Sequence, residues 1–211
     1  MEKKDLKPTG VFKYFEEICQ VPRPSKKEEK MIAYLKAFGA KHNLETKVDE
    51  AGNVLIKKPA TPGKENLQTV VLQSHIDMVC EKNNDVQHDF LTDPIETEID
   101  GEWLKAKGTT LGADNGIGVA TELAILADDS IEHGPLECLF TVDEETGLTG
   151  AFALQEGFMS GDILLNLDSE DEGEIFIGCA GGIDSVAEFT YKDIEVPAGY
   201  FFFKVEVKGL K

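Results

Sequence analysis

The sequence has no long apolar run, which limits the settings in which the protein can work. Among its 211 residues, no apolar stretch approaches the ~18 residues that a membrane-spanning helix needs. Residues 1–8 carry positive charge but lack the apolar core of a signal peptide. We therefore expect a cytoplasmic protein with no membrane partner.

The sequence is also poor in positive charge, with 21 basic residues against 40 acidic ones and a net charge of −19. Phosphate backbones and anionic membranes repel such a chain, which argues against nucleic acid as a partner. The hydrophobic fraction of 41% is typical of a globular protein. A chain of this length holds one sizeable domain, or one domain and part of another.

Cysteine is scarce and widely spaced, at Cys19, Cys80, Cys138 and Cys179. No two of these form a Cys-x-x-Cys pair, so the sequence lacks the usual zinc-knuckle and dithiol motifs. We expect free and mostly buried thiols in a reducing compartment. The sequence also lacks the nucleophile motif of serine hydrolases, the signature of nucleobase deaminases, and the glycine patterns of dinucleotide and phosphate loops.

Apolar periodicity predicts alternating helices and strands. Helices are expected at 9–20 with Thr9 as the N-cap, at about 25–42 where Ser25 has capping-box spacing, after Gly118, and at about 151–155. Strands are expected at 46–48, 54–56, 70–72, 136–142, 163–167, 185–191 and 200–207, with a hairpin at 99–104. The strands at 70–72 and 163–167 read as buried. This order predicts an α/β fold with a mixed, largely parallel sheet flanked by helices.

His75 and Asp77 directly follow the strand predicted at 70–72. In an open α/β sheet, ligands gather just beyond the carboxyl ends of the strands. A histidine there can bind a metal through one ring nitrogen while a carboxylate holds the other. On its own this pair is also compatible with an ordinary hydrogen bond in a loop.

The same arrangement recurs twice along the chain. Glu144 and Glu145 follow the strand at 136–142, and Asp168 follows the strand at 163–167. Asp114 begins a helix after the glycine-rich segment 108–118. Parallel strands with helical crossovers would bring these groups to one edge of the sheet.

A histidine among hard carboxylate oxygens suits zinc, manganese or cobalt, with Asp114 placed to bridge two ions. Two ions would clamp a carbonyl group and activate a water molecule. Glu144 and Glu145 are adjacent and cannot both bind the metal without strain, so one is expected to be a ligand and the other to take the proton of the water. The pattern thus predicts a dinuclear metal-dependent hydrolase.

Two alternatives compete with this prediction. Residues 168–179 have the glycine of a calcium loop at its sixth position, but the twelfth position is Cys179 instead of a bidentate glutamate. The second alternative is a non-catalytic metal-binding or assembly module that uses the same carboxylates.

Four motifs in order resemble those of the aminoacyl-histidine dipeptidases, or peptidase D. These belong to the co-catalytic zinc peptidases that also include aminoacylase, carnosinase and tripeptidase T. The motifs are His75-Ile-Asp77-Met-Val79, Gly108-Thr-Thr-Leu-Gly-Ala-Asp114-Asn-Gly-Ile-Gly118, Asp143-Glu-Glu-Thr-Gly-Leu-Thr-Gly-Ala151 and Leu167-Asp168-Ser-Glu-Asp171. Met78 and the Leu111-Gly112 pair favour the dipeptidase branch over the tripeptidase branch. A tripeptidase or an N-acyl amino acid deacylase of the same family remains the nearest alternative.

The resemblance implies a role for each matching residue. His75 and Asp168 would bind different zinc ions, and Asp114 would bridge the two ions through a turn with a cis peptide bond to Asn115. Glu145 would be a further ligand. The catalytic pair would be Glu144, as general base and then acid, and Asp77, which orients His75. The implied reaction is hydrolysis of small dipeptides of the Xaa-His type.

The resemblance also implies a difference in length. Family members are much longer, with a second metal-ligating histidine near the C-terminus and an inserted lid domain. We therefore interpret residues 1–183 as the N-terminal part of the catalytic domain, and residues 184–211 as its end and the incomplete beginning of the lid. On this interpretation the chain is a fragment whose second zinc site lacks its histidine. We expect weak metal binding, little activity, and no homodimer of the kind that the lid would form in a full-length parent.

Overall fold

The computed structural model describes residues 5–169, 171, 173–179, 181–183, 185–192, 195, 198–201 and 203–205. The chain divides into two compact units, Met1–Glu172 and Gly173–Lys211. Every helix and strand found among the described residues lies in the first unit. Within these residues, no helix is long and apolar enough to cross a membrane.

The first unit is built on a five-stranded sheet in the order β1-β2-β6-β3-β7. Its strands are β1 (Glu45–Val48), β2 (Val54–Lys58), β3 (Val70–His75), β6 (Leu136–Thr141) and β7 (Ile163–Asn166). Strand β3 runs parallel to both β6 and β7, whereas β2 is antiparallel to β1 and β6. The predicted mixed sheet flanked by helices is therefore confirmed. Because β3, β6 and β7 are parallel, their carboxyl ends meet at one edge of the sheet.

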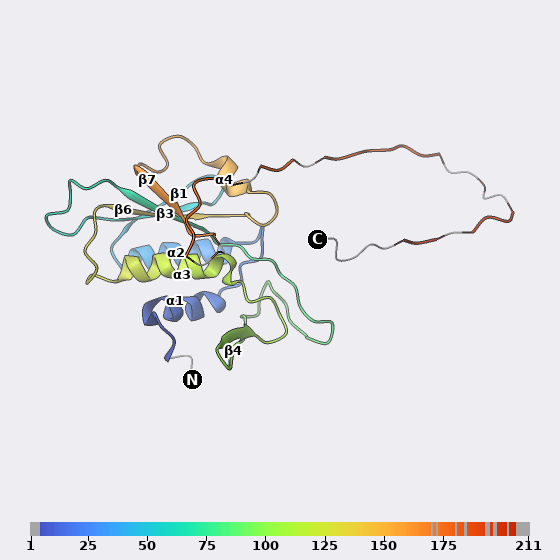
Figure 1. Cartoon of the computed structure of the whole chain (residues 1–211), viewed down its shortest axis with the longest axis horizontal. Coiled ribbons are helices and arrows are strands. Elements are labelled where there is room, and N and C mark those ends of the chain that lie inside the picture. Colours follow the sequence, from blue (N-terminus) through green and yellow to red (C-terminus); the bar gives the residue numbers. More distant parts are fainter. Residues whose placement is uncertain are drawn as a thin grey trace. The chain divides into compact units, whose positions relative to one another are not determined.

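Three helices lie on one side of this sheet, as Figure 1 shows: α1 (Thr9–Cys19), α2 (Glu29–Lys41) and α3 (Ala113–Ala127). Helix α3 packs on β3, α2 packs on β1 and β2, and α1 packs on α3. The main core forms between these helices and the sheet, and its largest fully buried side chains include Phe15, Met31, Leu35, Ile76 and Phe140. The short helix α4 (Thr149–Ala153) precedes a segment that covers part of the other face, where Leu55, Val71 and Leu139 form a small second core. Helix α4 begins two residues earlier than predicted.

The predicted hairpin at 99–104 is present, and the strands predicted at 46–48 and 54–56 form a second hairpin. Strands β1 and β2 are joined by a short turn around Gly52, and β4 (Thr97–Asp100) pairs with β5 (Trp103–Ala106) in a separate two-stranded sheet. Between β3 and β4 the chain is irregular from Ile76 to Glu96, apart from single bridges at Met78 and Lys82. This long loop leaves the sheet at the edge where the candidate ligands lie.

The two predicted N-caps are wrong. Helix α1 has Pro8 at its N-cap, and Thr9 is the first helical residue. Its hydroxyl accepts a hydrogen bond from Lys7. Helix α2 begins only at Glu29, and the hydroxyl of Ser25 donates instead to Asp77, 2.7 Å away. At Ser25, a contact with a residue distant in the chain replaces the local cap.

Two predictions about strands are also wrong. Strand β7 is an edge strand whose residues are all exposed, with Ile163, Leu164 and Leu165 at 40–48%, because it pairs only with β3 among the described strands. Residues 185–191, predicted as a strand, have no regular structure. In the predicted strand at 200–207, residues 202, 206 and 207 lie outside the described residues, and the rest have no regular structure. Of the four cysteines, Cys19 and Cys138 are buried, Cys80 is half-buried and Cys179 is exposed.

Candidate metal centre

The register of the three parallel strands places the predicted residues at one edge of the sheet. His75, the last residue of β3, lies opposite Thr141, the last residue of β6. Glu144 and Glu145 follow β6 after a short turn. Asp168 lies two residues beyond Asn166, the last residue of β7. The candidate ligands on these strands therefore come together because the strands end at the same level.

His75 is the buried centre of this group. Its Nδ1 atom lies 3.2 Å from a carboxylate oxygen of Asp77, and its Nε2 atom lies 2.9 Å from Asp114 Oδ1. The same Nε2 atom is 3.6 Å from Asp168 Oδ1 and 3.9 Å from Glu144 Oε2. One ring nitrogen thus faces a fixed carboxylate, and the other faces the acids that are candidates for a metal.

Asp77 connects His75 to the loop that carries the two glutamates. Its buried carboxylate accepts hydrogen bonds from the main-chain N–H groups of Glu144 (3.0 Å) and Glu145 (3.2 Å), and from the hydroxyl of Ser25 (2.7 Å). Burial raises the pKa of Asp77, but these bonds and the one with His75 outweigh burial and bring the pKa down to about 2. Asp77 is therefore a fixed anion that orients both the imidazole and the acidic loop.

Asp114 reaches the site from a distorted helix start. Gly112, the N-cap of α3, has a positive φ of 70°, which favours glycine. Asp114 and Asn115 have non-helical angles, and the peptide bond between them is cis, as the resemblance implied. This geometry turns the carboxylate of Asp114 toward His75.

Asp168 is held by Asn115, which joins it to α3. The Asn115 side chain donates to Asp168 Oδ1 at 2.7 Å, and its own oxygen accepts the N–H of Gly118 at 3.1 Å. Asn166 also accepts the N–H of Asp168 at 3.0 Å. Asn115 is buried, whereas Asn166 is exposed.

Two overlapping groups of these side chains can hold an ion. One consists of His75, Asp114 and Asp168, and the other of His75, Glu144 and Glu145, each with ligand atoms within 4.8 Å of one another. One imidazole with several carboxylates is a donor set that suits zinc, manganese or cobalt. Since Asp77 already occupies the other nitrogen of His75, the donor set fits a divalent ion at Nε2.

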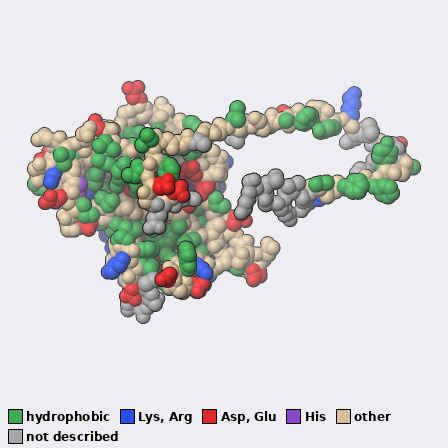
Figure 2. Space-filling model, viewed as in Figure 1, with side chains coloured by type: hydrophobic (Ala, Val, Ile, Leu, Met, Phe, Trp, Pro, Cys, Tyr) green, Lys and Arg blue, Asp and Glu red, His purple; other side chains and the backbone are tan. Residues whose placement is uncertain are grey.

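The electrostatics of the side chains at the site fit the same interpretation. Burial raises the pKa of Glu144, Glu145 and Asp168, and neighbouring acids raise these values further while His75 opposes the change. Burial alone would lower the pKa of His75, but Asp77 and Asp114 raise it to about 9. These acids therefore bind protons more readily than usual, and a divalent cation could neutralise their charge in place of the protons. Acidic side chains also outnumber basic ones on the visible face of the molecule (Figure 2), in line with the net charge of −19.

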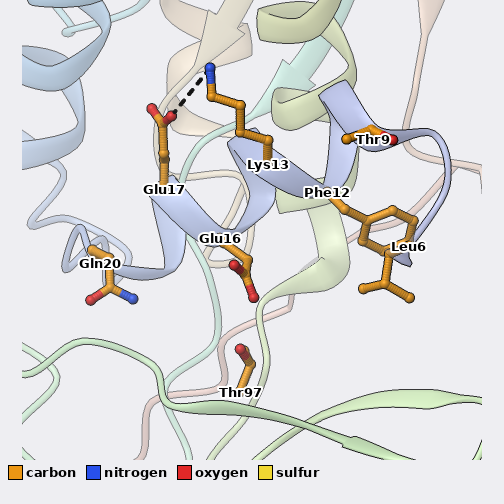
Figure 3. Close-up of a pocket in the computed structure, with 8 residues that line it drawn as sticks. All are labelled: Leu6, Thr9, Phe12, Lys13, Glu16, Glu17, Gln20 and Thr97. Carbon is orange, nitrogen blue, oxygen red and sulfur yellow. Dashed lines mark ion pairs between the residues drawn. The ribbon is translucent and has the colours of Figure 1, made fainter. Parts of the chain in front are cut away.

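A small cavity adjoins the site. It measures about 230 Å³, and Glu144 and Asp168 lie in its wall beside Gln73, Thr141 and Asn166. Another cavity, of about 580 Å³, lies along α1 (Figure 3), where Glu16 points toward Thr97 and Lys13 lies 3.9 Å from Glu17. No candidate ligand lines this second cavity, so we assign the chemistry to the edge of the sheet.

Sequence reasoning missed several residues that fix the site. Asn53 binds the N–H of Val142 and the carbonyl of Gly150, which are the two ends of the acidic loop. Glu28 accepts the N–H of Asp143. These residues act through contacts distant in the chain, which no local pattern shows. Glu28 and Asp143 also lie near Asp77 as a buried acidic group, in which both Asp77 oxygens and Glu28 Oε1 already accept hydrogen bonds.

Arg23 was also missed, although one signal marked it. It is the only arginine in the sequence, between Pro22 and Pro24. Its side chain is 2% exposed. Its guanidinium donates to the main-chain carbonyls of Ile76 (3.1 Å), Asp77 (3.0 Å) and Gly112 (2.6 Å).

The sequence pattern of peptidase family M20/M25/M40 matches residues 71–201. The chain belongs to this family. The match includes all six predicted site residues, His75, Asp77, Asp114, Glu144, Glu145 and Asp168. M20 peptidases are metal-dependent, and this chain has groups that can hold an ion.

Individual M20 relatives confirm the resemblance to dipeptidases. The chain is 52% identical to the cytosol non-specific dipeptidase of Escherichia coli over 210 residues, which is 100% of this chain and 43% of that protein. The crystal structure of the aminoacylhistidine dipeptidase of Vibrio alginolyticus matches with a TM-score of 0.80 and 55% identity, over 82% of this chain and 35% of that one. The aminopeptidase PepT of Bacillus cereus matches with a TM-score of 0.65 and 26% identity, over 77% of this chain and 43% of that one. The chain thus spans less than half the length of these M20 relatives.

Proposed function

We propose that this chain carries most of the active site of a metal-dependent dipeptidase that hydrolyses small peptides, including those of the Xaa-His type. The observation that carries the proposal is that His75 faces acids from three separate segments: Asp114, Glu144 and Asp168. The names of the E. coli and Vibrio relatives, a non-specific dipeptidase and an aminoacylhistidine dipeptidase, support this substrate class.

The proposed ligands are His75, Asp114, Glu145 and Asp168. Two zinc ions, or manganese or cobalt in their place, would share Asp114 as a bridge. The closeness of Asp114, Glu145 and Asp168 to His75 in the two overlapping groups supports this assignment. Bound metal would polarise the scissile carbonyl and lower the pKa of a water molecule.

Glu144 is proposed as the general base. Its carboxylate lies at the wall of the 230 Å³ cavity and 3.9 Å from His75 Nε2. Burial raises its pKa, which moves the group toward the neutral range in which a base works best. It would accept the proton of the attacking water and then pass it to the leaving amine.

Asp77 would fix the tautomer of His75 and hold Glu144 and Glu145 through their main-chain N–H groups. It would not touch the substrate. We place the protein in the cytoplasm, since its E. coli relative is a cytosol dipeptidase. The full-length protein would form a homodimer.

A tripeptidase or deacylase activity, or a non-catalytic metal-binding role, is the alternative. The relatives include a dipeptidase and an aminopeptidase, so residues outside the ligand set would decide the substrate. Comparing turnover of Xaa-His dipeptides, other dipeptides, tripeptides and N-acyl amino acids separates these possibilities.

The proposal is tested by zinc or manganese titration of the 211-residue chain, combined with an assay on histidine-containing dipeptides. We expect weak binding that His75→Ala abolishes, and low turnover that Glu144→Gln reduces by about 10²–10⁴-fold while the ion still binds. The exposed Glu156 provides the control Glu156→Gln, which should change neither. Binding that does not depend on His75 would contradict the metal site, and turnover that survives Glu144→Gln would contradict the base.

A further inference from the structure

Arg23 joins two segments that carry candidate ligands. Two of its acceptors, the carbonyls of Ile76 and Asp77, follow His75 at the end of β3. The third acceptor, the carbonyl of Gly112, belongs to the turn that presents Asp114. One buried side chain therefore spans the gap between the two loops whose ligands lie 2.9 Å apart.

The main chain around Arg23 strengthens this connection. The carbonyl of Arg23 accepts the N–H of Met78 at 3.2 Å, and Pro24 forms a parallel bridge with Met78. Ser25 donates to Asp77. The two prolines restrict the backbone torsions on either side of Arg23. Through these contacts, the segment from Arg23 to Ser25 is attached to the His75 loop.

The fit at Gly112 is close. A Cβ atom there would lie 2.5 Å from Arg23 Nη2, which is too short for any real contact. Gly112 thus allows the positive φ and also leaves room for the guanidinium. The planar fork of a guanidinium has five donors in a fixed geometry. A lysine ammonium has three donors on one atom, so it cannot hold the same separated carbonyls in the same arrangement.

We propose that Arg23 is a positioning residue that sets the separation of the His75–Asp77 loop and the Gly112–Asp114 turn, and thereby the geometry of the ion-binding pair His75 and Asp114. The effect on metal binding rests on the proposed function, whereas the positioning of the two loops by Arg23 does not depend on metal. The charge of Arg23 also lies near Asp77 and Asp114, and it offsets part of the repulsion among the acids.

The chain offers a matched control at the other end of α3. Lys58 is 7% exposed and donates to the main-chain carbonyls of Ile125 (3.0 Å) and Asp128 (2.8 Å). Like Arg23, Lys58 is a buried cation that stabilises the fold by donating to main-chain carbonyls near one end of α3. It differs from Arg23 in that none of its partners is next to a candidate ligand.

The test compares Arg23→Lys and Lys58→Met by hydrogen exchange in the metal-free chain and by zinc titration. Arg23→Lys keeps the positive charge, so it isolates the geometric role. We expect faster exchange at Met78 and Gly116, whose N–H groups bond to Arg23 and Gly112, and zinc affinity reduced about 10–100-fold. Lys58→Met should instead speed exchange near Asp128 and leave zinc affinity within about threefold of the wild type.

Wild-type exchange at Met78 and Gly116 in Arg23→Lys would overturn the proposal, whether or not the chain binds zinc. Global unfolding of Arg23→Lys would also overturn it, because the proposal confines the defect to two loops. An equal loss of zinc affinity in Lys58→Met would show a general effect of stability instead. Absence of zinc binding in the wild type would count against the proposed function, while the exchange data would still decide the role of Arg23.

Discussion

The two sides of the candidate metal centre are built differently. On one side, His75 and Asp77 are buried at and just beyond the end of the interior strand β3, and Asp77 accepts from Ser25, Glu144 and Glu145. On the other side, Asp168 follows the exposed edge strand β7, and its carboxylate is held by Asn115.

The difference shows that a shared edge of the sheet does not give its ligands equal support. The buried side is preorganised, because its ligands cannot move without breaking several hydrogen bonds. The edge side depends on few contacts, so Asp168 should adjust more readily to an ion. We therefore expect changes on the buried side to have larger effects than changes on the edge side.

Asp77→Asn should have the largest effect, because it breaks the buried side. The asparagine keeps one acceptor oxygen where four donors meet, so at least one half-buried main-chain N–H loses its partner at a cost of about 1–3 kcal/mol. We expect zinc affinity to fall about 100-fold and the free energy of unfolding to fall by about 2 kcal/mol. Calorimetric zinc titration and urea unfolding measure the two quantities. A variant with wild-type affinity would show that Asp77 does not orient His75.

Asn115→Ala should have a smaller effect on the edge side. Removing the amide releases Asp168 and the N–H of Gly118, and we expect zinc affinity to fall about 10-fold. Asn84→Ala, at an exposed position in the long loop, is the control and should leave the affinity unchanged. A loss in Asn115→Ala equal to that of Asp77→Asn would contradict the proposed difference between the two sides.

Glu122→Gln should have the smallest effect on metal binding, since Glu122 lies on the helix side of β3. Its buried carboxyl accepts from Ser74 at 2.6 Å and lies against Cys138. Burial raises its pKa well above the ordinary value of 4.5. The unfolded chain therefore releases this proton at a lower pH than the folded chain, so the wild type loses stability as pH rises from about 4.5 to the folded pKa.

The glutamine cannot ionise, so the unfolding free energy of Glu122→Gln should fall less than that of the wild type as pH rises through this range. Urea unfolding at a series of pH values measures the difference, with Glu156→Gln as the control at an exposed position. Identical pH dependence in Glu122→Gln and the wild type would contradict the buried neutral carboxyl. A large loss of zinc affinity would place Glu122 in the site after all.

The sequence predicted the candidate site better than it predicted local details of the fold. Acids and an imidazole after strand ends are a local signal, and parallel strands convert it into proximity, so the meeting of His75, Asp114, Glu145 and Asp168 followed from topology. The cis bond before Asn115 came only from the family resemblance. Residue roles stay predictions until metal and turnover are measured.

Local patterns failed where a distant contact decided the outcome. Ser25 has the spacing of a helix cap, but its hydroxyl binds Asp77. Arg23 lies between two prolines, a local pattern that indicates only the end of a helix, and its partners lie more than fifty residues away. Strand β7 has the composition of a buried strand, but composition does not reveal that it lies at the sheet edge. Periodicity records which residues favour burial, and the sheet order decides which of them achieve it.

Segments distant in the sequence deliver one imidazole and several carboxylates into a group of side chains that can hold an ion. Anomalous scattering from a crystal of the chain soaked in zinc or manganese would show whether they do. We expect metal density bounded by His75, Asp114, Glu145 and Asp168, with Glu144 beside it. Metal density elsewhere, or these side chains separated by well over ~10 Å, beyond the reach of one shared coordination sphere, would contradict it.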